Sequence, residues 1–153
     1  MQTFLPYADF KESAQCLDYR RLGKQRVEAK QIHNIVSSGR TTGGWVNHPA
    51  VKMWRGYAEA LAWYYNIICL EWLDRGYDNN MLPLRVYGVP LRDTEMPPFI
   101  GNKDFHDSHK SNLLRKDPEF YGWYEWDVPD NLSYVWKVEN YDNARYRKII
   151  YNK

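Results

Sequence analysis

The residues with the clearest chemical potential lie in one stretch of the chain, residues 14–36. At 100° per residue its apolar side chains fall on one face of a helix, and Arg21 and Glu28 fall on that same face. A carboxylate and a guanidinium on a core-facing side are costly unless they are paired, hydrogen-bonded or functional. A buried salt bridge from Glu28 to Arg21 or Arg26 is therefore the structural alternative to a functional role. The cations in and around this face are Arg20, Arg21, Lys24 and Arg26.

Charge is unevenly distributed along the chain, although the formal net charge is only +2. Residues 1–56 carry nine Lys or Arg and four Asp or Glu, whereas residues 57–99 carry three and six. A basic first third favours a polyanionic partner such as nucleic acid, and a solvated basic helix face is the alternative.

A second group of candidate nucleic-acid contacts lies near the start of another predicted helix, at Asn47-His48-Pro49. This sequence combines a capping residue with a proline suited to the first turn. Because helix N-termini attract phosphate, His48 and Arg55 are candidate DNA-binding residues, with an ordinary surface cluster as the alternative.

Residues 104–116, DFHDSHKSNLLRK, form a third polar segment whose side chains suit contacts to phosphates or bases. Its candidate DNA-binding residues are His106, His109, Lys110, Asn112, Arg115 and Lys116. The two histidines have a spacing that zinc can use, but no third ligand is in view. We therefore expect neither a metal nor another cofactor.

The chain is rich in aromatic residues, with 7 Trp, 13 Tyr and 5 Phe, and many of them follow residue 120. Aromatic rings build cores, and they also stack on nucleic-acid bases. Trp123 and Tyr124 are the candidate stacking residues, and a tail that covers the helices is the alternative.

The bulk properties indicate one domain, residues 1–153, in a monomeric protein of the reducing cytoplasm. Cys16 and Cys69 are isolated and have no metal-ligand spacing. The N-terminus does not resemble a signal peptide. The longest apolar stretch, near residues 60–70, is too short to span a membrane.

Three main helices are predicted to carry these residues: residues 14–36, residues 49–75 and residues 104–116. Gly23, in the middle of the first helix, indicates either the close approach of another backbone or a kink.

Residues 1–9 form an extended arm, because Pro6 disfavours helix before it. The apolar side chains of the arm should dock it against the helices and place the Met1 α-amino group inside the structure. Residues 77–103 and the tail are predicted to be irregular, with candidate strands at residues 84–87 and 133–138. The predicted fold is thus an all-α domain of three main helices, with an N-terminal arm and long irregular, aromatic-rich connections and tail.

The order and spacing of several motifs resemble the phage and bacterial endonuclease V family of pyrimidine-dimer DNA glycosylases. Residues 19–27, YRRLGKQRV, are similar to that family's arginine-rich first helix, and residues 71–77, EWLDRGY, to the end of its second. Residues 106–118 are similar to its third helix, and residues 121–124, YGWY, to its aromatic C-terminal segment. Residues 48–55 are similar to the bacterial branch. The likeness covers most of residues 10–126.

This resemblance implies a compact all-α enzyme that acts on double-stranded DNA. In the family the N-terminal α-amine attacks C1′ of the damaged nucleotide, a Schiff base forms, and β-elimination can cut the strand. A glutamate on the first helix assists, and nearby arginines hold phosphates, so Met1 and Glu28 are the implied catalytic residues. An α-amine titrates near 8, against about 10.4 for lysine, so more of it is free to attack at neutral pH.

The chain departs from the family pattern at three places. Gln2 follows Met1, and methionine aminopeptidases generally trim only before small residues, so Met1 itself would supply the amine. Tyr19-Arg20-Arg21-Leu22 stands where the family has Tyr-Arg-Glu-Leu, which leaves Glu28 as the glutamate placed to act. Cys16 stands where the family has a histidine. Two alternatives therefore stay open: a non-catalytic DNA-binding module on the same scaffold, and a glycosidic-bond enzyme that acts on a small nucleotide.

Overall fold

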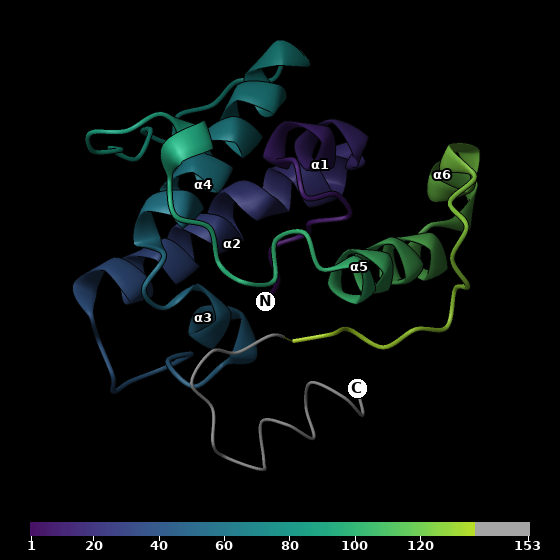
Figure 1. Ribbon diagram of the computed structural model, residues 1–153. Helices are drawn as coiled ribbons and strands as arrows, with labels where there is room; N and C mark the ends of the chain where they lie inside the picture. The colour runs from purple at the N-terminus through teal and green to yellow at the C-terminus, as the bar shows by residue number, and fades with distance from the viewer. Residues whose placement is uncertain (137–153) are drawn as a thin grey trace.

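Two long helices, α2 (Tyr19–Ser38) and α4 (Ala58–Asp74), pack against each other at the centre of the fold (Figure 1). The computed structural model describes residues 1–136. Gly23 of α2 lies where a Cβ would come within 2.9 Å of the Trp72 ring of α4. The close neighbour at Gly23 is therefore a side chain, and not the backbone that the sequence suggested.

Each of the first two predicted helices is in fact two helices. The first consists of α1 (Phe10–Cys16) and α2, because Asp18 is extended, with ψ of 157°, and caps α2 by accepting a bond from the Arg21 amide. The second consists of α3 (Pro49–Trp54) and α4, with Gly56 between them at φ of +85°. The start of α3 is as predicted, since the His48 side chain caps it and Pro49 occupies its first turn.

The third predicted helix is confirmed as α5 (Lys103–Lys116), and the short helix α6 (Pro118–Tyr121) follows it. Two single 3₁₀ turns, η1 (Leu91–Asp93) and η2 (Gly122–Tyr124), lie in the otherwise irregular connection and tail. Residues 122–136 then return past α5 towards α3 (Figure 1).

Residues 1–136 contain no strand, so the all-α class is confirmed and the strand expected at residues 84–87 is wrong. The Leu84 amide and carbonyl bond to the Asn66 side chain, at 2.8 and 2.7 Å, instead of to another strand. Residues 133–136 are not a strand either, and residues 137–138 lie outside the described part. The sequence also ends in a basic segment, and this segment likewise lies outside the described part; its cations are Arg145, Arg147, Lys148 and Lys153.

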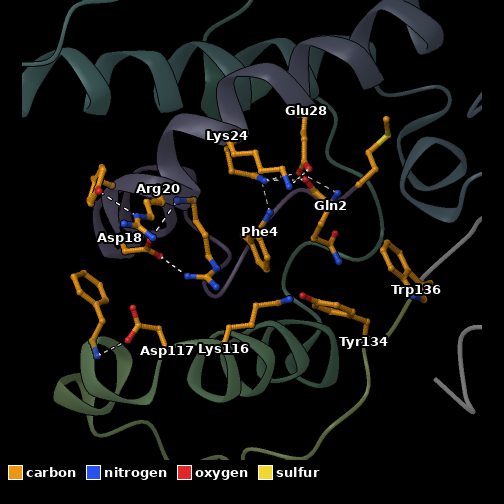
Figure 2. Close-up of a pocket in the computed structure, with 15 residues that line it drawn as sticks. Gln2, Phe4, Asp18, Arg20, Lys24, Glu28, Lys116, Asp117, Tyr134 and Trp136 are labelled. Atoms are coloured by element: carbon orange, nitrogen blue, oxygen red, sulfur yellow. Dashed lines mark hydrogen bonds and ion pairs between the residues drawn. The ribbon is translucent and has the colours of Figure 1, made fainter.

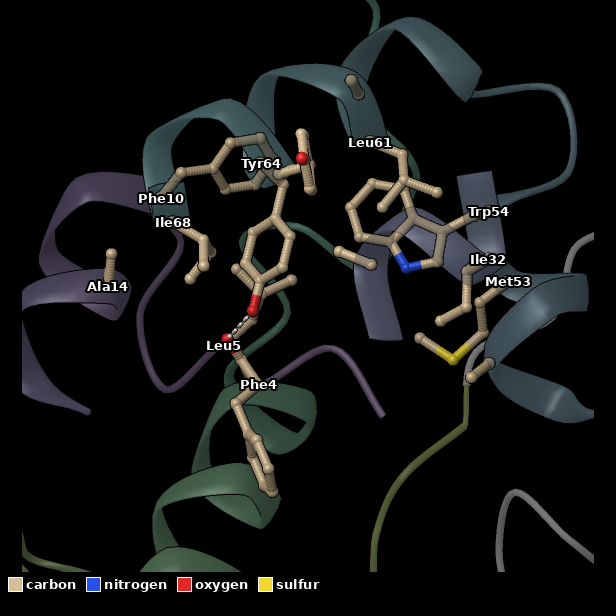
Figure 3. Packing of buried hydrophobic residues seen from close by; sticks show 14 of the residues in the cluster. Phe4, Leu5, Phe10, Ala14, Ile32, Met53, Trp54, Leu61, Tyr64 and Ile68 are labelled. Atoms are coloured by element: carbon tan, nitrogen blue, oxygen red, sulfur yellow. Dashed lines mark hydrogen bonds between the residues drawn. The ribbon is translucent and has the colours of Figure 1, made fainter. Parts of the chain in front are cut away.

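The N-terminal arm runs through the interior, as predicted, between the α2–α4 pair and α5 (Figure 1). A buried extended backbone needs hydrogen-bond partners, and here side chains supply them. The Phe4 amide donates to Gln25 Oε1 at 3.0 Å, and the Tyr64 hydroxyl reaches the Phe4 carbonyl at 2.8 Å (Figure 3). The arm is therefore a part of the core, and its position fixes that of Met1.

The largest fully buried side chains of the core are aromatic, which accounts for part of the high aromatic content of the chain. Trp54 and Tyr64 are fully buried, and Phe10 packs edge-on against Tyr64 at 5.5 Å (Figure 3). The Trp54 indole donates to Thr3 Oγ1 at 3.0 Å, which adds a further hold on the arm. No helix within residues 1–136 has the length and apolar character needed to cross a membrane.

Candidate active site

The arm ends at a pocket of about 770 Å³, which we call the N-terminal pocket. Met1 and Glu28 both line it, so the structure brings the two predicted catalytic residues together. Helix α2 supplies one wall with Lys24 and Glu28, and Lys116 at the end of α5 lies across from them (Figure 2). Its other lining residues are Gln2, Phe4, Asp18, Tyr19, Arg20, Arg21, Gln25, Asp117, Phe120, Tyr134 and Trp136.

Glu28 faces the arm, with a side chain that is only 14% exposed. Its Oε2 accepts from the Gln2 amide at 3.3 Å and from Gln25 Nε2 at 3.1 Å. Its Oε1 lies 3.7 Å from Lys24 Nζ. The carboxylate therefore has partners for both oxygens and keeps one edge towards the pocket.

The structural alternative for Glu28, a buried bridge to Arg21 or Arg26, is not what the side chains form. Arg21 pairs with Asp18 at 3.1 Å. Arg26 donates to Asn79 Oδ1 at 2.7 Å, and its guanidinium lies 4.2 Å from the centre of the Trp72 ring. Arg26 therefore points away from the pocket, towards α4.

The Met1 α-amino group is close to Glu28, because the amide of the next residue donates to that carboxylate. Consecutive backbone nitrogens are less than about 3.8 Å apart, which puts the amine within roughly 7 Å of Glu28 Oε2. Burial lowers the pKa of His48, and the positive charge of the Met1 amine lowers it further. The His48 ring also packs edge-on against Trp136 at 5.8 Å.

Gln25 connects the arm to Glu28. The sequence indicates that Gln25 lies on the core-facing side of α2, but it does not identify the partners of this side chain. Its side chain accepts from the Phe4 amide and lies 2.7 Å from the Tyr64 hydroxyl. Its Nε2 donates to the Gln2 carbonyl at 2.9 Å as well as to Glu28. Burial, above all, raises the pKa of Tyr64, so this hydroxyl remains a donor. The feature of the sequence that could have identified this role is the position of Gln25, an uncharged polar residue, on an apolar face of the helix.

The entrance of the pocket is basic. Arg20 and Lys116 are exposed, and Lys24 has a side chain that is 74% exposed. Arg21 is oriented by its ion pair with Asp18. Burial alone would raise the pKa of Asp18, but hydrogen bonds from Tyr121 and Arg21 outweigh it and lower this pKa below its ordinary value. The entrance therefore presents several cations, which can contact phosphates, around the Met1–Glu28 pair.

Two predicted DNA-binding histidines lie in the core instead. His109 is fully buried, and its Nδ1 accepts from the Leu5 amide at 2.9 Å. His106 Nδ1 lies 2.7 Å from the Leu5 carbonyl, and His106 Nε2 accepts from the Gly101 amide at 2.9 Å. These rings hold the arm and do not face the pocket. The sequence of residues 104–116 alone could not reveal this, because both rings bond to Leu5, which lies far away in the chain.

Three further candidates lie outside the pocket. Arg55 donates to the Arg40 carbonyl at 2.7 Å. Lys110 lies over the Tyr7 ring at 4.8 Å. Trp123 is 87% exposed and lies on η2.

The remaining candidates hold or flank the returning tail. Tyr124 donates to the Cys16 carbonyl at 3.0 Å. Asn112 donates to the Leu132 carbonyl at 3.1 Å, and Arg115 Nη2 reaches the same oxygen at 3.3 Å. Asn112, Arg115 and His48 also line a smaller hollow of about 450 Å³, which shares the rings of Tyr134 and Trp136 with the N-terminal pocket. Across residues 1–136, no three His, Cys, Asp or Glu side chains are grouped so as to hold a metal ion.

Comparison with known proteins agrees with this geometry. A family model described as pyrimidine dimer DNA glycosylase matches residues 1–83, which contain the arm, Glu28 and the basic residues of α2. Neither a curated protein nor a solved structure matches the chain. Because the match covers more than half of its length, this chain belongs to the pyrimidine dimer DNA glycosylase family.

Proposed function

We propose that the protein is a DNA glycosylase with lyase activity, that it acts as a monomer on double-stranded DNA, and that it removes damaged or modified pyrimidines. The observation that carries the proposal is the shared pocket of Met1 and Glu28, with the Gln2 amide bonded to the Glu28 carboxylate. The family match supports the substrate class.

In the proposed reaction the neutral Met1 amine attacks C1′ of the damaged nucleotide. The glycosidic bond breaks, and the base leaves with the bonding electron pair and takes up a proton. Loss of a proton from the attacking nitrogen and opening of the sugar ring at O4′ give a Schiff base between that nitrogen and C1′. Removal of a C2′ proton then expels the 3′ phosphate by β-elimination.

Glu28 has two roles in this scheme. Its carboxylate stabilises the positive charge that develops on the sugar, and it relays protons between the amine and O4′. Arg20, Arg21, Lys24 and Lys116 hold the phosphates on either side of the target nucleotide. A pocket closed by residues 77–103 would favour a small nucleotide as the substrate. These residues contribute no lining residue to the N-terminal pocket, which supports a DNA substrate.

The test is base release from ultraviolet-irradiated duplex DNA by Glu28→Gln. Removing a general acid–base group costs about 10²- to 10⁴-fold in rate, and we expect a loss in that range. Glu71→Gln is a matched control, because Glu71 is also a helical, ion-paired glutamate with a side chain 16% exposed. It lies on α4 and pairs with Arg75, the residue that caps this helix. Salt-sensitive duplex binding with no base release by the unmodified protein would instead identify a non-catalytic DNA-binding module.

A further inference from the structure

Gln2 carries a hydrogen-bond donor that has no partner within residues 1–136. The residue is 6% exposed, and its Nε2 is one of the few buried side-chain nitrogens without a bond. This nitrogen is almost fully shielded from bulk water, which therefore compensates little for the missing acceptor. A buried polar group of this kind is costly, and it calls for an explanation.

The orientation of the Gln2 amide is fixed by its neighbours. Its Oε1 accepts from the Thr3 amide at 2.9 Å, so rotating the side-chain amide by 180° would set an NH₂ group against that donor. The backbone of Gln2 is held on both sides, by Glu28 at its amide and by Gln25 at its carbonyl. The free N–H is thus a rigid feature.

The donor faces the aromatic corner of the N-terminal pocket. Figure 2 shows the Gln2 side chain directed into the space flanked by Phe4, Tyr134 and Trp136. The Tyr134 ring centre lies 6.4 Å from that of Phe4 and 5.6 Å from that of Trp136. Flat apolar walls beside a single fixed donor suit a planar ring that has an acceptor on its edge.

We propose that Gln2 Nε2 donates to a carbonyl oxygen of the nucleobase that enters the N-terminal pocket, and that Gln2 thereby determines which bases are accepted. The ring of the base would lie against Tyr134 or Trp136, and its sugar would lie towards Met1 and Glu28. This inference rests on the proposed function for the nature of its ligand.

The inference is tested by the affinity for two duplexes that differ in one nucleotide. Each duplex carries an unpaired residue, either thymidine or its apolar isostere, in which fluorine atoms replace the carbonyl oxygens. The unmodified protein should bind the thymidine duplex roughly five- to tenfold more tightly, as expected for one neutral hydrogen bond. Gln2→Met lacks the donor, keeps a long second residue after Met1, and should bind both duplexes equally.

Two further variants separate recognition from structure. Gln2→Glu retains the oxygen that accepts from Thr3 but lacks the N–H, so it should also lose the preference. Gln31→Met, at an exposed position of α2, should keep it. An unchanged preference in folded Gln2→Met and Gln2→Glu overturns the inference, even where bases are released normally. A preference that disappears with the Gln2 donor upholds it, even if no base is released and the proposed function is wrong.

Discussion

At the scale of single residues, His109 ties the arm to α5 through a ring nitrogen that must stay unprotonated. Burial, followed by the neighbouring charge of His106, lowers the pKa of His109 to about 3. An unfolded histidine titrates near 6.5, so between about pH 6.5 and 3 the unfolded chain binds a proton that the folded chain excludes. The stabilisation is therefore complete above pH 6.5 and is lost as the pH falls.

We predict that the free energy of unfolding decreases between pH 7 and pH 5 with a slope approaching about 1.4 kcal/mol per pH unit from this residue alone. His109→Asn places an acceptor near the position of Nδ1 and does not titrate in this range, so its profile should be flatter by up to that amount. Urea unfolding at several pH values measures both slopes, and equal slopes in the two proteins would contradict the assignment.

The role of an individual residue could be predicted from the sequence only where the pattern of neighbouring residues determines which way its side chain faces. Glu28 was identified because it interrupts an apolar face, and the structure places it beside the arm. The partners of Gln25 and His109 were not predictable, because an extended arm such as residues 1–9 has no periodicity that sets its register against distant helices.

At the scale of the elements, the contact between α2 and α4 depends on the absence of a side chain at Gly23. A Cβ there would lie 2.9 Å from the Trp72 ring, which cannot retreat easily because it stacks on Tyr77 at 4.3 Å and lies under Arg26. Gly23→Ala should therefore destabilise the fold by about 1–3 kcal/mol, although alanine favours helix.

The matched test is Gly23→Ala combined with Trp72→Leu. The smaller side chain leaves room for the new methyl group, so the Gly23→Ala change should cost less in the Trp72→Leu background than alone. A double-mutant cycle from denaturant unfolding gives the coupling. An equal cost in both backgrounds would show that the Trp72 ring does not restrict this position.

Helix existence was predictable from the sequence, but the breaks within helices were not. The break before α2 depends on Asp18, whose carboxylate accepts a bond from the Tyr121 hydroxyl, 103 residues away. The break before α4 lies at Gly56, inside an apolar pattern that continues across it. The apolar residues keep their 3.6-residue spacing across both breaks. A prediction from this spacing alone therefore merges the two helices on either side into one.

At the scale of the whole molecule, exposed cations from two distant parts of the chain meet at one entrance. Arg20 and Lys24 come from α2, and Lys116 comes from the end of α5. If each cation neutralises one DNA phosphate, each contributes close to 0.9 to the slope of log affinity against log salt concentration.

Lys116→Gln should lower this slope by about 0.9 and weaken binding at low salt. Lys103→Gln is the control, because Lys103 is equally an exposed lysine of α5, but it lies at the other end of the helix and pairs with Asp107. Fluorescence anisotropy over a salt series measures both variants. The same slope for Lys116→Gln and for the unmodified protein would remove Lys116 from the interface.

The central claim is that the Met1 amine attacks the sugar, and trapping of the Schiff base tests it most directly. The protein is incubated with a duplex that contains one abasic site, borohydride is added, and the digested adduct is analysed by mass spectrometry. We predict a reduced covalent adduct on the peptide that begins at Met1, attached through its α-nitrogen. No adduct, or an adduct on a lysine side chain such as Lys24, would contradict the claim.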